Sequence, residues 1–272
     1  MSRRDRGLEP LLAATGPDLG HLVLDDLVPD DALHDLVGRI DPADLRAVRG
    51  GARLRVRPLL VALSARAAGA AQVDAELQHA AELLHLALIV HDLTLGQPGG
   101  RRRRVARRVL RRLGGSHLTV RALELSRHVG SPDVLGEVVD ALRAFSDGQG
   151  LARELVEQGL PPRRSEVEDH ADDHHGALYA FCCRAGAHVA GAGAPTVAAL
   201  GRYGRHLGRL WTLADDQVAL SGVDAAAHLA ERAAAGRPVL AVAVAAARDA
   251  DLAPAWARLV RRGQDAPQVL ER

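Results

Sequence analysis

Apolar residues recur at helical spacing along most of this chain. Between Val73 and Val90 they cover nearly every face toward the C-terminal end of the segment, which is typical of a helix that lies centrally in a bundle. Residues 32–40 show the same helical spacing before Pro42. The predicted helices cover residues 30–40, 59–70, 73–90, 101–113, 118–128, 131–145, 150–158, 165–189, 195–219, 224–234 and 238–247, and only a weak tail follows Pro254.

Short breaks, not long linkers, separate these predicted helices. Gly50-Gly51, Gly96–Gly100 and Pro161-Pro162 interrupt the pattern. Ser165 and Glu168 have the spacing of a capping box, which predicts the start of the helix over 165–189. No internal repeat is present. We therefore expect one all-α domain over residues 21–272, after a poorly ordered segment over residues 1–20.

Composition supports this fold class and narrows the function. Of 272 residues, 47% are hydrophobic and only 2% aromatic, which excludes general disorder and disfavours a β-sandwich or barrel. All 35 basic residues are Arg, and the net charge of +1 gives no overall field for nucleic acid or anionic lipid.

The expected location is the cytoplasm. Cys182 and Cys183 are adjacent in a predicted helix, so they point in different directions and do not suggest a disulfide. The N-terminus lacks the apolar stretch of a signal peptide, and no run of about 18 apolar residues predicts a membrane span.

Three polar motifs carry the candidate chemistry, and they follow one another in a fixed order. The first contains Gly-Gly and ends in Arg-Pro, the second places a His seven residues before an Asp, and the third contains Asp-Asp. They are Gly50 to Pro58, Glu82 to Asp92 with Arg101-Arg102 after it, and Gly204 to Gly222.

Together, these motifs resemble the trans-isoprenyl diphosphate synthase (polyprenyl synthetase) family from about Gly50 to Val239. That family has a Gly-Gly-Lys…Arg-Pro motif, then an E-L-x-H-x6-D-D-x-x-D helix followed by Arg-Arg, then a second D-D-x-x-D helix that ends in Gly. The resemblance implies a helical bundle of the isoprenoid synthase type with a central cavity.

The resemblance also implies the chemistry of the cavity. An allylic diphosphate must ionise, and Mg²⁺ held by two facing Asp-bearing helices neutralises the leaving group. Arg and His side chains bind diphosphate. The implied diphosphate ligands are Arg53, Arg57, His85, Arg101, Arg102 and Arg237, although two extra residues in the first motif leave the roles of Arg53, Arg55 and Arg57 open. The implied metal ligands are Asp92, Asp215 and Asp216.

The chain departs from the family pattern on the metal side. At the other three positions where the family motifs have Asp, this chain has Leu93, Gly96 and Ala219. The family's Lys-Thr pair appears as His174-His175, its Phe-Gln as Trp211-Thr212, and its later Gly-Lys as Gly236-Arg237. Because metals and diphosphate bind as a unit, we expect magnesium binding to be weak or absent and chain elongation to be severely weakened.

Simpler interpretations stand beside these assignments. Asp92 and the Asp215-Asp216 pair could instead be solvated residues at the rim of the bundle. His85 could be a histidine of the core, and the arginines of 101–112 could form a solvated helix face. His170 and His174, at i and i+4, have the spacing of a zinc chelate, but a charged surface turn has the same pattern.

In the family, bulky side chains four and five residues before the first Asp close the end of the product tunnel. Ala87 and Leu88 occur there, which predicts a deep or open tunnel.

Two functions follow from this sequence. The first is a diphosphate-binding or accessory subunit, as a homodimer or paired with a competent prenyl synthase, with no nucleic-acid partner and no membrane span. The alternative is an active prenyltransferase or terpene-synthase-like enzyme that uses Asp92, Asp215, Asp216 and Mg²⁺. His91-Asp92 also matches part of a metal phosphohydrolase motif, but the other His and Asp residues do not fall at matching intervals.

Overall fold

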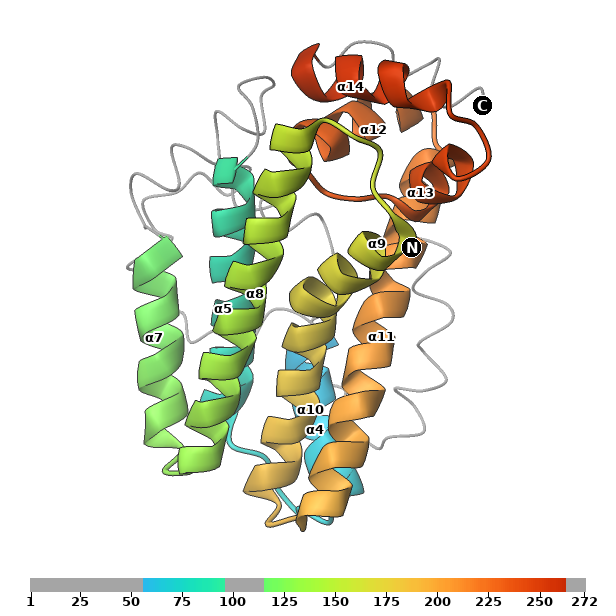
Figure 1. The fold of residues 1–272 in the computed structure, drawn as a ribbon. Helices are drawn as coiled ribbons and strands as arrows, with labels where there is room; N and C mark the ends of the chain where they lie inside the picture. Colours follow the sequence, from blue (N-terminus) through green and yellow to red (C-terminus); the bar gives the residue numbers. More distant parts are fainter. Residues whose placement is uncertain (1–55, 96–114, 263–272) are drawn as a thin grey trace.

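The computed structural model describes residues 56–95 and 115–262, and this part of the chain contains helices and no strand (Figure 1). The predicted helices over 30–40 and 101–113 and the predicted poorly ordered segment over 1–20 lie outside the described residues. The elements are α4 (Val56–Ala67), α5 (Ala75–Leu95), α7 (Gly115–His128), α8 (Pro132–Gln158), α9 (Arg164–Ala171), the π-helical segment η3 (Asp172–Gly176), α10 (Ala177–Val189), α11 (Ala194–Leu220), α12 (Ala225–Ala234), α13 (Leu240–Ala246) and α14 (Leu252–Arg262).

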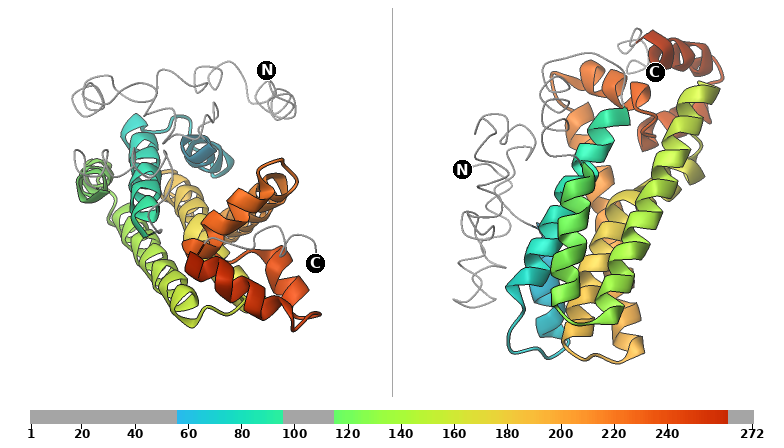
Figure 2. Two further views of the ribbon diagram at one scale, coloured as in Figure 1. Left: turned by 90° about the horizontal axis from the view of Figure 1, so that it is seen from above. Right: turned by 90° about the vertical axis from the view of Figure 1, so that its left-hand side faces the viewer.

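The long helices form a bundle around α10. Helix α10 contacts α4, α8 and α11, and α5 joins α4 to α7 (Figures 1 and 2). Helices α12 and α14 lie across one end of the long helices, at the top of Figure 1. The prediction of an all-α bundle is confirmed. None of the described helices is long and apolar enough to cross a membrane.

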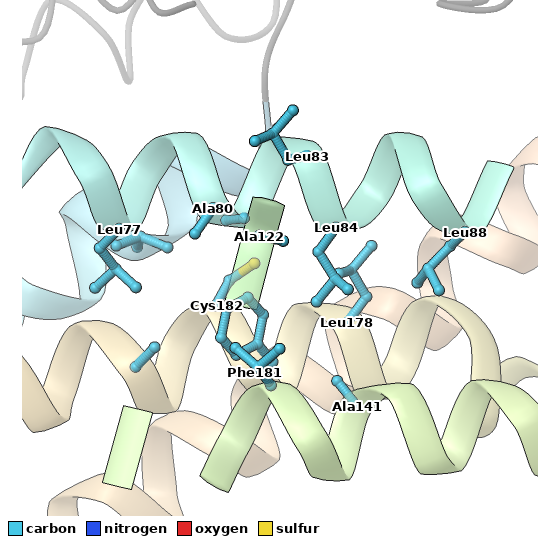
Figure 3. Close-up of a cluster of buried hydrophobic side chains, with 14 of the residues drawn as sticks. Leu77, Ala80, Leu83, Leu84, Leu88, Ala122, Ala141, Leu178, Phe181 and Cys182 are labelled. Carbon is cyan, nitrogen blue, oxygen red and sulfur yellow. The ribbon is translucent and has the colours of Figure 1, made fainter. Parts of the chain in front are cut away.

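Small aliphatic side chains fill the main core, as the scarcity of aromatic residues requires. Leu77, Leu84 and Leu88 of α5 point toward α10, which contributes Leu178 and Phe181 to the same cluster (Figure 3). All five side chains are at most 3% exposed, and each buried aliphatic side chain contributes about 1.5–3 kcal/mol relative to an exposed one. This cluster joins α5 and α10 within the bundle.

The chain around Pro254 differs from the weak tail expected there, because it contributes to a second core cluster. Leu252, Trp256 and Leu259 lie on one face of α14 and are at most 4% exposed. They pack with Leu229 of α12 and Val239, which precedes α13. The i, i+4, i+7 spacing of these side chains is helical, so α14 is a packed element that covers the end of the bundle.

Helix α8 is continuous from Pro132 to Gln158, although two helices were predicted over 131–145 and 150–158. Ser131 caps its N-terminus by accepting a hydrogen bond from the Val134 backbone N–H, and Gly159 ends it with a φ of 62°. Gly148 does not break the helix. A Cβ at this position would lie 3.0 Å from the Cβ of Asp173, so the glycine allows α8 to approach η3 closely.

The predicted helix over 165–189 is also different in the structure. It begins at Arg164, where the backbone N–H of Arg163 donates to Glu166 Oε2 at 2.6 Å, so the predicted pairing of Ser165 with Glu168 is wrong. The helix then widens into η3 before continuing as α10. Cys182 and Cys183 of α10 are free and buried, and burial raises the pKa of both thiols.

Replacing Gly204 of α11 by Ala is expected to destabilise the protein. A Cβ there would lie well inside contact distance of the Tyr179 carbonyl oxygen of α10, and a backbone atom cannot turn aside as a side chain can. We expect G204A to lower the free energy of unfolding in urea by about 1–3 kcal/mol. The control is Gly136→Ala in the exposed part of α8, where no atom lies within 4 Å of the new Cβ. This control should be stabilising by about 0.5–1 kcal/mol, and equal effects of the two substitutions would refute the close contact.

Candidate functional site

The π-helical segment η3 brings a row of aromatic rings to the inner side of the bundle. π-Turns inside α-helices occur frequently at functional sites because they redirect side chains locally. The His174 ring centroid lies 5.6 Å from that of His170 and 4.5 Å from that of His175. The row continues from His175 to Tyr179 and from Tyr179 to Trp211, at 6.2 Å in each case. It therefore joins α9, η3, α10 and α11.

His175 is a neutral hydrogen-bonding residue within this row. Its Nδ1 lies 2.9 Å from Thr212 Oγ1, and the Thr212 hydroxyl is 3.2 Å from the Gly208 carbonyl oxygen, to which it donates. Since that hydroxyl proton is used, the Nδ1 of His175 is the donor to Thr212. Burial lowers the pKa of His175 well below its ordinary value, and the nearby His174, Arg57, His85 and Arg232 lower it further.

Arg57 lies against two neighbouring aromatic rings. Its guanidinium carbon lies 5.4 Å from the centroid of Tyr179 and 6.0 Å from that of Trp211, which is cation–π distance. The Arg57 side chain is buried, and its Nε has no hydrogen-bond partner among the described residues. The hydroxyl of Tyr179 is also buried without a partner there, and burial raises its pKa to about 12. The rings therefore fix a positive charge inside the bundle.

The Asp residues near the end of α11 differ in their surroundings. Asp215 is exposed, whereas Asp216 is 4% exposed. Arg232 of α12 donates a hydrogen bond from Nη2 to Asp216 Oδ1, and His228 Nε2 lies 3.7 Å from the same oxygen. The third position of this motif, Ala219, carries no ligand.

A small, partly open pocket lies beside η3 and α8. The polar side chains that line it are Gln149, His170, His174 and Arg237, and all four can donate hydrogen bonds. The Nε2 of Gln149 is buried without a partner among the described residues. A lining of donors without a carboxylate suits an anion.

Comparison with known proteins identifies the family. The polyprenyl synthetase family model matches residues 44–228, which is more than half of the chain. The chain belongs to the polyprenyl synthetase family.

Similar proteins of this family include two curated relatives. One is heptaprenyl diphosphate synthase component 2 of Geobacillus stearothermophilus, 28% identical over 218 residues, with 71% of this chain and 62% of the relative covered. The other is short chain isoprenyl diphosphate synthase of Methanothermobacter thermautotrophicus, 28% identical over 202 residues, with 69% and 62% covered. The alignment with each thus covers somewhat less than two thirds of the relative's length.

Solved structures of the family share the fold. A polyprenyl synthase of Caulobacter crescentus, complexed with calcium and isoprenyl diphosphate, aligns with a TM-score of 0.70 and 24% identity over 98% of this chain and 81% of its own. A heptaprenyl diphosphate synthase of Staphylococcus aureus has the same TM-score at 17% identity, over 89% of this chain and 80% of its own.

The structure brings part of the predicted family site together. Arg57 and His85 lie near His175, and Arg237 lines the pocket. The α5 backbone is described through Leu95 and includes Asp92, but the side chains of α5 are described only as far as Leu88. Arg53, Arg101 and Arg102 lie outside the described residues.

Ala87 and Leu88 are 0% and 3% exposed within the main core cluster, and Leu88 points toward α10 (Figure 3). The tunnel that they would shape stays a prediction. The rings of His170 and His174 stack. Over the described part of the chain, no group of three or more His, Cys, Asp or Glu residues is placed to hold a metal ion.

Three residues of the site were not found from the sequence. Gln149 and Tyr179 lie outside the recognised motifs, and Arg232 lies in an Ala-rich helix. The signal that could have indicated Arg232 is its i, i+4 spacing from His228, which places two basic side chains on one face.

Asp173 of η3 makes stability depend on pH. Burial raises its pKa from 3.8 to about 6, and Asp147, Asp172 and Asp169 add to this, whereas Arg205 opposes it. The folded protein therefore favours the protonated carboxyl, and stability is lost as pH rises from about 4 through 6.

We expect Asp173→Asn to be more stable than the wild type at pH 7.5, by an amount on the order of 1 kcal/mol because the carboxyl is only half-buried and partly screened. The difference should vanish near pH 4. Urea unfolding across this range is the measurement, with exposed Asp140→Asn as the control. A constant difference between wild type and D173N at all pH values would contradict the assignment.

Proposed function

We propose that this protein binds isoprenoid diphosphates and acts as an accessory subunit of a prenyl diphosphate synthase, with impaired magnesium-dependent chain elongation. The observation that carries this proposal is the contrast between the two sides of the site. The side expected to bind diphosphate keeps its cations, whereas the second Asp motif has lost ligands.

The donor groups around the pocket support diphosphate binding. Arg237 supplies a permanent charge, while His170, His174 and Gln149 supply further N–H donors. Hydrogen bonds from charged donors to phosphate oxygens are roughly twice as strong as neutral ones. A diphosphate presents many acceptor oxygens and suits this lining better than a neutral ligand does.

The second Asp motif supports the proposed impairment. Mg²⁺ takes six oxygen ligands in nearly octahedral geometry. Ala219 provides none, Asp215 is exposed, and Asp216 is paired with Arg232. Among the described residues of this motif, Asp215 is therefore the carboxylate left for a magnesium ion, and a single carboxylate holds this ion weakly. Without it, the lining can bind a diphosphate but lacks a Lewis acid at the departing oxygen.

The name of one relative supports the role of a subunit. The Geobacillus protein is called component 2 of a heptaprenyl diphosphate synthase, which implies another component. We propose a competent prenyl synthase as the partner of this chain. A homodimer is the arrangement expected in the absence of that partner.

Product analysis with and without a homologous synthase tests the proposal. The purified protein receives labelled homoallylic diphosphate, one allylic diphosphate at a time, and Mg²⁺. We expect no elongation by the protein alone, because its second Asp motif holds the metal only weakly. In the mixture, we expect a change in the product length made by the synthase.

Arg237→Gln should reduce this change in the mixture, since it removes the permanent charge of the pocket, whereas Arg248→Gln at an exposed position should not. Elongation by the unaided protein at a rate comparable to the synthase would instead establish the alternative, an active prenyltransferase that uses Asp92, Asp215, Asp216 and Mg²⁺.

A further inference from the structure

The buried carboxylate of the second Asp motif is already bound to an internal cation. The side chains of Asp216 and Arg232 are 6% and 12% exposed, and Arg232 Nη2 donates to Asp216 Oδ1. His228 Nε2 lies 3.7 Å from the same oxygen. Two basic groups of α12 thus occupy the side of Asp216 that faces α12.

The packing of α12 fixes this contact. Leu229 and Ala233, each 1% exposed, hold one face of α12 in the cluster with α14. Just after α12, Gly236 has a φ of 66°, and a Cβ there would overlap the Ala152 carbonyl oxygen of α8. Since the helix is anchored on one face and at its end, it cannot rotate freely, and Arg232 is held against Asp216.

Magnesium would have to displace this arginine to use Asp216 fully. Asp216 Oδ2 has no hydrogen-bond partner among the described residues, but it is buried and lies beside a paired oxygen. A metal bound there would leave the Arg232 guanidinium mostly buried without its counter-charge, which is strongly unfavourable. Asp215 and Ala219 do not complete a set of ligands.

Arg232 also lies near the row of aromatic rings that includes His175. It is among the charges that lower the pKa of His175, together with Arg57. Its fixed positive charge therefore acts on the interior of the bundle, where a metal ion would otherwise supply the charge. Arg232 Nε is buried and has no hydrogen-bond partner in the described part of the chain.

We propose that Arg232 replaces magnesium at the second Asp motif, so that a diphosphate binds to fixed cations without a metal. The identity of the ligand rests on the proposed function, whereas the exclusion of the metal does not. Two measurements separate these parts: calorimetry with inorganic pyrophosphate, in EDTA and in Mg²⁺, and electron paramagnetic resonance with Mn²⁺ alone.

For the wild type, we expect dissociation constants for pyrophosphate that agree within about threefold in EDTA and in Mg²⁺, and no bound Mn²⁺. Arg232→Gln frees Asp216. We expect R232Q to bind pyrophosphate at least about tenfold more weakly in EDTA, to recover part of this loss in Mg²⁺, and to bind Mn²⁺. The matched control is Arg202→Gln, which removes the same charge from an exposed position of α11 and should behave as the wild type.

Pyrophosphate binding by the wild type that is at least about tenfold tighter in Mg²⁺ would overturn the proposal. Equal Mn²⁺ binding by wild type and R232Q, whether present in both or absent from both, would also overturn it. If neither protein binds pyrophosphate under any condition, the proposed function fails, while Mn²⁺ binding by R232Q alone still supports the role of Arg232.

Asp216→Asn provides a second variant if R232Q does not fold by circular dichroism. It removes the internal counter-charge and keeps the fixed cation. We expect D216N to bind pyrophosphate in EDTA at least as tightly as the wild type. Loss of that binding would show that the carboxylate is needed for the anion, and it would overturn the proposal.

Discussion

The site depends on the close contact that α11 makes with α10 and with the π-helical segment η3 before it. At Gly204 and Gly208 a side chain would overlap the carbonyl oxygens of Tyr179 and His175, so the two backbones meet where only hydrogen fits. This contact sets His175 opposite Thr212 and Tyr179 opposite Trp211. Larger residues at the two glycines would separate the helices that carry the site.

Charges in this interior are fixed by contacts within the chain. Arg57 lies against the Tyr179 and Trp211 rings, and Arg232 is bound to Asp216. The buried His175 is neutral, so it adds a donor and no further charge. An anion that enters such a site meets groups already in place, and less free energy is spent on ordering them. The same pairing removes Asp216 from the ligands that a metal needs.

Periodicity made most of the helices predictable, because apolar spacing reports directly which face is buried. It failed where tertiary contacts decide. Two helices were expected over 131–145 and 150–158, but α8 is continuous and Gly148 between these ranges allows the approach to Asp173. Pro254 and neighbouring polar residues concealed the buried face of α14.

The motifs predicted the family because their order and spacing lie in the sequence itself. They indicated Arg57, His85 and Arg237, which the structure places in or beside the site. They could not indicate the pairing of Asp216 with Arg232. That contact joins two helices and depends on how α12 packs against α14, which no local spacing encodes.

The most direct test of this account is a crystal of the wild-type protein grown with Mn²⁺ and inorganic pyrophosphate, with anomalous scattering used to locate manganese. The account predicts an anion held by Gln149, His174 or Arg237, with Arg232 still on Asp216 and no anomalous peak at that carboxylate. An anomalous peak bound to Asp216, with Arg232 displaced, would contradict it.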